Sequence, residues 1–361
     1  MHFCNYQIQL FQKLSQFCHH NQYNTFSQNF TVKIHMNDPS YLTLYKSGEL
    51  ARRVRYLNKI LESCNICPRQ CAVDRNQDRS GYCRSGRLAC VCSYCDHHGE
   101  EPPLSGCNGS GTIFFGNCNL HCVFCQNADI SQHLRQVESY EYTPRRLAKI
   151  MIQLQNEKKC HNINLVSPSH FVPQIVEAVQ IACAHGLNLP LVYNSNGYDS
   201  VQTLQILDGI IDIYLPDLKY ADDLYARKYS AALRYVETAR AAIKEMYRQV
   251  GLLQQDDQGL ARRGLIIRHL VLPNQLAGSS ASLEWIAREI SSDVTISLMA
   301  QYYPANFAAQ IPLLSRPLQY GEYQKVLAVM EKLGLHNSLY QELNAADYYR
   351  PHFFASDHPF A

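Results

Sequence analysis

Short apolar segments alternate with amphipathic segments along most of this 361-residue chain. The apolar segments, which we predict to be strands, are 112–115, 162–166, 189–193, 210–215, 264–272 and 294–299. Nearly continuous apolar runs are typical of strands that are buried on both faces of a parallel sheet. Alternation with helices therefore predicts an α/β fold, with a parallel sheet covered by helices and fewer units than the eight of a closed barrel.

Signals for helix starts and stops lie between these strands. Thr143 and Pro144 are typical of an N-cap and a first helical position, and Gly334 follows the last segment of helical periodicity. Ahead of the first strand, 49–61 carries apolar residues at helical spacing and predicts a helix. The polar segment 254–263 predicts a loop.

Three cysteines follow the first predicted strand, in the pattern Cys118-x3-Cys122-x2-Cys125. Thiolates are soft ligands, and three of them close in sequence can surround one compact metal centre. A [4Fe–4S] cluster ordinarily takes four cysteines, so a cluster held here would leave one iron open to a small molecule. The alternative is three buried or zinc-binding cysteines.

A second group of four cysteines precedes this motif. Its members are Cys64, Cys67, Cys71 and Cys83. Zinc and iron–sulfur clusters both accept four thiolates, and the spacing does not choose between them. Pro68 and Gly81 supply the tight turns that such a site needs. The metal could be an auxiliary redox cluster, or it could only stabilise a small subdomain with little core.

The remaining cysteines between the two groups fit no metal template. They are Cys90, Cys92, Cys95 and Cys107, and we interpret them as small buried apolar residues. The cysteines are clustered and the given sequence shows no secretory signal, which favours a protein of the reducing cytoplasm. It also has no apolar run long enough to predict a membrane-spanning helix.

The net charge of +2 argues against a protein that seeks nucleic acid over its whole surface. Locally, however, 52–87 holds nine Lys and Arg residues against Glu62, Asp74 and Asp78. A four-cysteine zinc ribbon that binds nucleic acid is therefore an alternative function. Against it, no series of aromatic residues or recognition helix accompanies the basic residues.

Polar residues follow most of the predicted strands. They occur at 167–170, 194–197, 217–219, 268–269 and 299–302. Because the carboxyl ends of parallel strands share one edge, we expect a site there. We interpret His170 and His269 as structural histidines with satisfied ring nitrogens. Asp217 and Lys219 point to the same face and are expected to pair with each other.

Several longer motifs carry a family resemblance. They are CxxCPRxC at 64–71, GEEPPL at 99–104, GSGTIFF at 109–115, CxxxCxxC at 118–125, NINLVSPSHFVP at 162–173, YNSNGY at 193–198, YLPDLKY at 214–220 and RHLVLP at 268–273. With these motifs the chain resembles the pyruvate formate-lyase activating enzyme-like branch of the radical S-adenosylmethionine (radical SAM) superfamily. The resemblance implies a partial (β/α)6 TIM-like barrel, preceded by a small cysteine-rich N-terminal subdomain.

The resemblance also implies a mechanism. A [4Fe–4S] cluster on Cys118, Cys122 and Cys125 would receive an electron from a flavodoxin- or ferredoxin-like donor. It would cleave S-adenosylmethionine to a 5′-deoxyadenosyl radical, which abstracts hydrogen from a substrate. The residues expected to contact S-adenosylmethionine are Phe124, near the adenine, and Ser167, Asn194, Asp217 and Arg268, near the ribose or methionyl groups.

Two departures leave the substrate open. Activating enzymes of this kind carry a Gly-Gly-Glu turn after the second strand, whereas this chain has Ser167-Pro168-Ser169-His170. The four-cysteine group also precedes the cluster motif instead of following it. The substrate is either a glycine of a partner protein or a small molecule. A plain electron-transfer protein would need neither six strands nor an open iron.

We expect four regions along the chain. They are a poorly ordered tail (1–35), an N-terminal helix with the cysteine-rich metal-binding subdomain (36–110), the partial barrel (111–334) and a C-terminal extension (335–361).

Overall fold

A computed structural model describes residues 38–77, 81–343, 351–354 and 359–360, so the predicted tail lies outside the described residues. The strands are β1 (Ala89–His97), β2 (Ser110–Phe115), β3 (Glu141–Tyr142), β4 (Ile163–Val166), β5 (Leu191–Ser195), β6 (Ile213–Pro216), β7 (Gln254–Gln255), β8 (Ala261–Leu270), β9 (Thr295–Met299) and β10 (Ser338–Tyr340). The α-helices are α2 (Tyr41–Lys46), α3 (Glu49–Ile60), α4 (Pro102–Ser105), α5 (Ala128–Ser131), α6 (Pro144–Asn156), α7 (Val172–Cys183), α8 (Val201–Ile206), α9 (Asp223–Ser230), α10 (Tyr235–Val250), α11 (Ser279–Glu289) and α12 (Tyr320–Lys332). The short 3₁₀ helices are η1 (Leu61–Ser63), η2 (Val137–Tyr140), η3 (Pro273–Gln275) and η4 (Ala308–Gln310).

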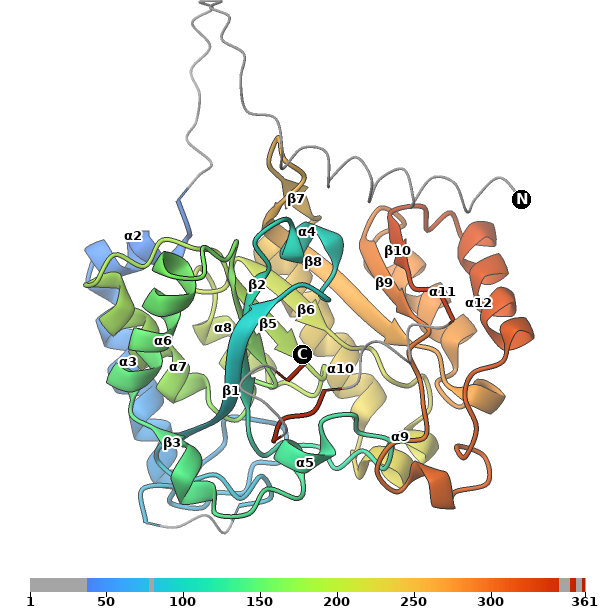
Figure 1. The fold of residues 1–361 in the computed structure, drawn as a ribbon, viewed down its shortest axis with the longest axis horizontal. Helices are drawn as coiled ribbons and strands as arrows, with labels where there is room; N and C mark the ends of the chain where they lie inside the picture. Colours follow the sequence, from blue (N-terminus) through green and yellow to red (C-terminus); the bar gives the residue numbers. More distant parts are fainter. Residues whose placement is uncertain (1–37, 78–80, 344–350, 355–358, 361) are drawn as a thin grey trace, which may run out of the picture.

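The strands form one sheet in the order β10-β9-β8-β6-β5-β4-β2-β1-β3, with β7 paired to β8 (Figure 1). Every pair from β2 to β10 along this path is parallel. The six predicted strands correspond to β2, β4, β5, β6, β8 and β9, and the prediction of an α/β fold with a parallel sheet is confirmed. The two strands at the ends of this order, β10 and β3, do not pair with each other. The sheet is therefore open and forms a partial barrel.

Other strands were not predicted. β1 runs antiparallel to β2, and β10 adds a parallel strand beside β9. The prediction of a loop at 254–263 is wrong in part, because β7 pairs with the start of β8 in a hairpin. The turn of this hairpin is closed by Asp256, whose carboxylate accepts hydrogen bonds from the backbone of Gln258 and Leu260.

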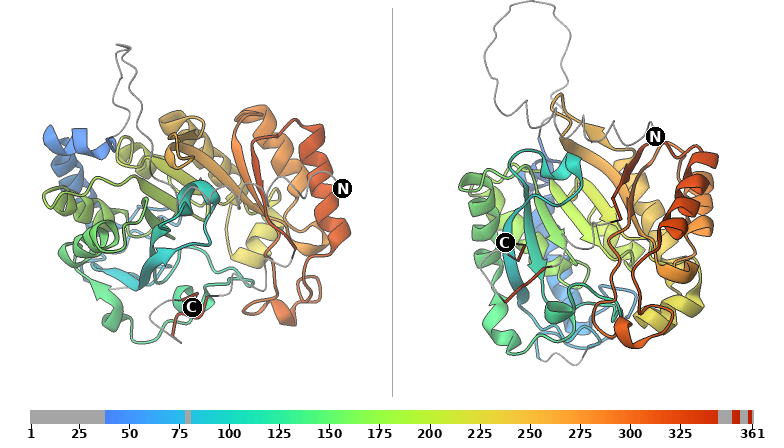
Figure 2. Two further views of the ribbon diagram at one scale, coloured as in Figure 1. Left: turned by 45° about the horizontal axis from the view of Figure 1, so that its top comes forward. Right: turned by 45° about the vertical axis from the view of Figure 1, so that its right-hand side comes forward.

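The helices form an outer layer over the sheet (Figures 1 and 2). α6 starts as predicted, with the Thr143 hydroxyl accepting from the Arg146 backbone and Pro144 in the first turn. α3 buries Leu50, Val54 and Leu57, as its predicted apolar face requires.

Successive residues of a strand face opposite sides of the sheet. On β5, β6 and β8 the outward residues belong to the main core with the helices; they include Tyr193, Tyr214, Leu265 and Ile267. The inward residues form a separate small core inside the barrel; they are Val192, Ile213, Leu215, Ala261 and Ile266, packed with Leu104 of α4. The barrel interior is therefore filled at the end where its parallel strands begin.

The segment that fills this end comes from the loop after β1. Asn162 donates a hydrogen bond from Nδ2 to the Leu104 carbonyl at 2.8 Å and accepts one from the Ser110 hydroxyl at 2.6 Å. Near β1 and β2, Phe353 packs with Phe114 and Cys95. No helix within the described residues has the length and apolar character needed to cross a membrane.

Candidate functional site

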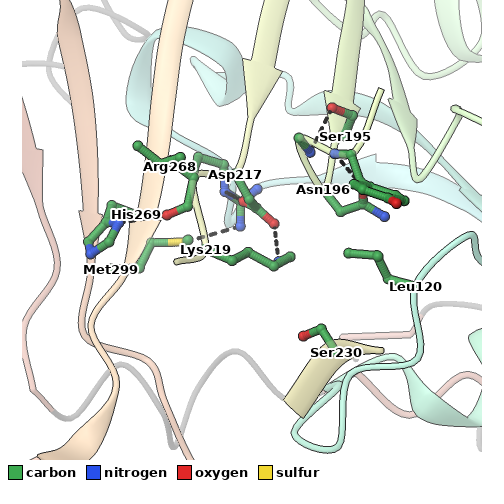
Figure 3. Close-up of polar contacts among 12 residues, drawn as sticks. Leu120, Ser195, Asn196, Asp217, Lys219, Ser230, Arg268, His269 and Met299 are labelled. Carbon is green, nitrogen blue, oxygen red and sulfur yellow. Dashed lines mark hydrogen bonds and ion pairs between the residues drawn. The ribbon is translucent and has the colours of Figure 1, made fainter. Parts of the chain in front are cut away.

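Side chains alternate between the two faces of each strand, and this alternation directs a set of polar side chains into the barrel. Asn194 lies two residues after the inward Val192, and Arg268 lies two residues after the inward Ile266. Asp217 follows the inward Leu215 at the same spacing. Figure 3 shows Asp217 next to Lys219 and Arg268. The predicted convergence of strand ends is therefore observed for these residues.

The three-cysteine loop connects β2 to α5 at this end of the barrel. The Cys118 Sγ accepts hydrogen bonds from the Leu120 backbone N–H and from Asn196 Nδ2, each at 3.4 Å. Asn196 also donates to Asn119 Oδ1 at 2.7 Å. The loop is therefore fastened to the segment after β5, with one thiol already receiving donors suited to a thiolate.

The three thiols influence one another electrostatically. Burial raises the pKa of Cys118 to about 12, and Cys122 and Cys125 add to the rise. Burial also raises the pKa of Cys122 to about 11, although the nearby Lys219 opposes this. The thiols of Cys118 and Cys122 are thus neutral without a metal, and metal binding would have to release their protons.

Lys219 and Asp217 form a close ion pair, as predicted. The Lys219 Nζ donates to Asp217 Oδ2 at 2.5 Å. Burial alone would lower the pKa of Lys219, but Asp217 and Cys122 outweigh burial and raise it. Lys219 is therefore a cation that faces both a carboxylate and the cysteine loop.

Arg268 lies among three carboxylates. Its Nε is 3.4 Å from Asp217 Oδ1 and 3.7 Å from Glu101 Oε1, and its Nη1 is 3.6 Å from Glu100 Oε2. Within the described residues, its guanidinium donates a hydrogen bond only to Met299 Sδ, at 3.1 Å. A thioether is a weak acceptor. Burial would lower the pKa of Arg268, but the carboxylates raise it, so this residue stays charged.

These contacts test whether the residues fit an iron–sulfur cluster with S-adenosylmethionine. Asp217 Oδ1 and Arg268 Nε are buried without a hydrogen-bond partner among the described residues. Unpartnered buried polar atoms are costly, and a zwitterionic ligand with hydroxyl groups supplies both donors and acceptors. Three neighbouring thiols lie beside them. The donor set therefore fits both groups.

Two other predicted ligand residues lie around this set. Phe124 is buried and makes edge contacts with Tyr220 and Tyr302, at centroid distances of 6.4 and 6.0 Å. Ser167 has a φ of 60°, which is uncommon for a residue other than glycine, and its N–H donates to the Asn194 carbonyl. Strained backbone of this kind is concentrated at functional sites.

The prediction of a structural histidine with satisfied ring nitrogens is confirmed for His269, whereas the Nδ1 of His170 is buried without a hydrogen-bond partner among the described residues. His269 is fully buried between the Leu218 carbonyl at 2.7 Å and the Ser279 hydroxyl at 2.9 Å. His170 is 3.0 Å from the Gly116 carbonyl, just ahead of the cysteine loop. Arg75, which was not predicted, holds the backbone around it by donating to the His170 carbonyl at 2.6 Å.

The second cysteine group lies next to the cysteine loop. Burial raises the pKa of Cys67 to about 12, and the thiols of Cys83, Cys64 and Cys71 contribute to the rise. Arg69 connects the two groups by donating to the Asn119 carbonyl at 3.0 Å. Among the described residues, no group of three or more His, Cys, Asp or Glu side chains has the arrangement for a single metal ion.

Cys107 follows α4 and is exposed, so its prediction as a small buried apolar residue is wrong. The other three cysteines between the two groups lie on β1. Cys90 and Cys95 are buried there, which agrees with their interpretation as small apolar residues.

Glu100 and Glu101 are the main site residues that the sequence did not predict. They were noted within the motif GEEPPL, but their segment precedes every predicted strand. The signal that could have found them is the pair of adjacent carboxylates followed by two prolines, because prolines restrict the backbone and hold such a pair in place.

Known proteins are similar to this chain over parts of its length. Residues 112–261 match the family model of the Radical SAM superfamily. The chain is 32% identical over 304 residues to the uncharacterized protein MJ0674 of Methanocaldococcus jannaschii, covering 83% of this chain and 82% of that protein. It is 27% identical over 198 residues to the uncharacterized protein MJ0808 of the same organism, covering 50% and 56%. The solved structure of methylornithine synthase (PylB) is similar with a TM-score of 0.43 and 13% identity, covering 85% of this chain and 76% of that chain.

Proposed function

Because this chain belongs to the radical SAM superfamily, we propose that it is an enzyme that cleaves S-adenosylmethionine reductively and uses the product to activate a substrate. The observation that carries the proposal is the position of Cys118, Cys122 and Cys125 beside the buried and incompletely hydrogen-bonded Asp217 and Arg268. When bound, a [4Fe–4S] cluster supplies the electron that splits S-adenosylmethionine into methionine and a 5′-deoxyadenosyl radical, which takes a hydrogen atom from the substrate.

The residues of the chain bind and orient the reactants. Cys118, Cys122 and Cys125 would hold the cluster through their sulfur atoms. Lys219 favours the thiolate form of Cys122, because its positive charge lowers the pKa of that thiol. Asn196 donates to the sulfur of Cys118 and keeps the loop closed against the strand ends.

The remaining predicted residues orient S-adenosylmethionine. Arg268 offers donors to the methionyl carboxylate, and Asp217 offers an acceptor to the ribose hydroxyl groups. Asn194 and Ser167 lie at the adjacent strand ends, and Phe124 supplies an aromatic surface for the adenine. Phe124 and Asn194 are buried and would help to exclude water from the reacting carbon.

The activity also needs partners. A flavodoxin- or ferredoxin-like protein in the cytoplasm supplies the electron. Cys64, Cys67, Cys71 and Cys83 hold a second centre, either zinc or iron–sulfur, next to the cysteine loop. The substrate is a small molecule or a glycine of a partner protein, as in activating enzymes of the pyruvate formate-lyase type.

Anaerobic turnover tests the proposal. The protein is purified without oxygen, reduced with dithionite and mixed with S-adenosylmethionine, and the products are separated by chromatography. Wild type is expected to form 5′-deoxyadenosine and methionine, and Cys122→Ala is expected to form neither. Intact S-adenosylmethionine in the presence of a full, reduced cluster would contradict the proposal.

A further inference from the structure

The interior of the barrel contains a second group of unsatisfied polar side chains, distinct from the cysteine loop. Glu100 and Glu101 enter from the loop after β1 and are followed by α4, whose Leu104 packs in the small core inside the barrel. The carboxylates therefore lie on the side of Arg268 that is nearer to the start of the parallel strands, whereas the cysteine loop lies beyond the ends of these strands.

Several atoms of this group lack hydrogen-bond partners among the described residues. Asn164 of β4 is 0% exposed, and both its Nδ2 and its Oδ1 are unpartnered. Glu101 is 8% exposed, and its Oε2 is unpartnered. The two carboxylates approach Arg268 only to 3.6 and 3.7 Å, which is too long for hydrogen bonds. Burial of such groups is costly unless a ligand satisfies them.

The charges of the group indicate which ligand would do so. The group has three carboxylates, on Glu100, Glu101 and Asp217. The cations beside them are Arg268 and Lys219, and Lys219 is already paired with Asp217. One negative charge is therefore in excess. Burial raises the pKa of Glu100 to about 7, and the charge and the carboxyl group of the adjacent Glu101 add to the rise. Arg268 and the nearby Asn164 lower this pKa but do not outweigh burial, as expected of buried carboxylates that lack enough positive charge.

We propose that Glu100, Glu101 and Asn164 form the inner end of the substrate site and bind a cationic nitrogen of the substrate, an alkylammonium or guanidinium group. This inference rests on the proposed function, because it names the class of substrate on which that chemistry acts. The cation occupies the inner end, so the carbon chain attached to it extends toward the strand ends, where S-adenosylmethionine is cleaved.

Calorimetry with four probes of one chain length tests the site. Pentylamine, pentylguanidine, 1-pentanol and pentanoate are titrated into the anaerobic holoenzyme, with and without saturating S-adenosylmethionine. The two cations are expected to bind saturably in both conditions, and the alcohol and the carboxylate are expected not to bind. Glu101→Gln is expected to weaken cation binding by about tenfold or more, since a hydrogen bond to a charged acceptor is lost.

A control variant and two tests of folding accompany the binding measurements. Glu284→Gln, on the exposed face of α11, controls for the loss of a carboxylate and is expected to bind like wild type. Iron content and circular dichroism show whether Glu101→Gln is folded; if it is not, the comparison of cations with pentanol and pentanoate in wild type still decides. A failure of the proposed function, seen as a lack of S-adenosylmethionine cleavage, can be distinguished from a failure of this inference, because cation binding is measured without turnover.

Three results would overturn the inference. The first is no saturable binding of either cation, and the second is equal binding of the cations and the neutral or anionic probes. The third is displacement of the cations by S-adenosylmethionine, which would mean that the carboxylates hold the methionyl ammonium instead.

Discussion

At the scale of single residues, the site depends on close packing between the strand ends. Gly197 follows β5 with a φ of 77°, and a Cβ at this position would overlap the backbone carbonyl of Asp217. The neighbouring Asn196 donates to Cys118, so the same turn positions the cysteine loop. A side chain at position 197 would therefore disturb both the backbone at Asp217 and the position of the cysteine loop.

Gly197→Ala is expected to lower the free energy of unfolding by about 3 kcal/mol or more, because left-handed backbone strain adds to a clash with backbone. Gly186→Ala is the matched control: its φ is 86°, but no atom lies within 4 Å of the added Cβ. We expect a loss of about 1 kcal/mol there. Equal losses in urea unfolding would contradict the proposed clash.

His269 makes stability depend on pH. Burial lowers its pKa to about 4 in the folded protein, against an ordinary value of 6.5. Between these values the unfolded chain binds more protons than the folded protein, so stability is retained above pH 6.5 and lost as the pH falls. We expect the contribution of His269 to fall by about 2 kcal/mol from pH 7 to pH 5.

The check compares urea unfolding at the two pH values in wild type, His269→Gln and the control His336→Gln, at an exposed position. The pH-dependent loss is expected to shrink in His269→Gln and to be unchanged in His336→Gln. An unchanged loss in His269→Gln would show that another group is responsible.

The sequence predicted Asn194, Asp217 and Arg268 as site residues, because each stands at or just after the end of a recognisable parallel strand. It could not place Glu100 and Glu101 next to Arg268. That contact depends on how the loop after β1 enters the barrel, which is a property of tertiary packing and not of a local pattern.

At the scale of elements, α4 fills the end of the barrel opposite the cysteine loop. Pro102 and Pro103 restrict its first turn, and Leu104 is fully buried against Val192 and Ile213. This short helix therefore closes the interior and at the same time positions the two carboxylates that precede it.

Leu104→Ala is expected to destabilise the protein by about 3 kcal/mol, because it leaves a cavity among inward strand residues that cannot collapse easily. Leu224→Ala removes the same atoms from a side chain that is 64% exposed and should change stability by about 0.5 kcal/mol at most. Thermal unfolding of both variants checks this. A small loss in Leu104→Ala would mean that α4 is not part of the core.

The elements that were predicted are those with long, regular patterns. The helix α3 and the six parallel strands were found because their apolar periodicity is set by burial on known faces. β1 was missed because its sequence, ACVCSYCDH, mixes cysteines with polar residues and has neither a continuous apolar run nor strict alternation. β10 has three residues and none of them is buried, so its pairing with β9 left little trace in the sequence.

At the scale of the whole molecule, an open barrel is covered at the cysteine-loop end by the second cysteine group. Arg69 joins the two by donating to the carbonyls of Asn119 and Ala231, and its guanidinium lies 3.6 Å from the Tyr82 ring centroid. A metal bound by this group would therefore stabilise the cover of the site as well as its own loop.

Cys67→Ala is expected to remove that metal while the cluster on the three-cysteine loop is retained. Analysis of iron, sulfide and zinc in wild type and variant measures the loss and identifies the metal. We also expect a lower thermal midpoint, because metal binding stabilises only the folded state. Identical metal content in both proteins would exclude a site at Cys67.

Cys118, Cys122 and Cys125, as we propose, hold a cluster whose remaining iron binds S-adenosylmethionine. Electron paramagnetic resonance of the reduced protein, recorded with and without S-adenosylmethionine, tests it most directly. We expect a cluster signal that changes on addition of S-adenosylmethionine in wild type and in Cys67→Ala, and that is absent in Cys122→Ala. A signal that ignores S-adenosylmethionine, or that persists unchanged in Cys122→Ala, would contradict it.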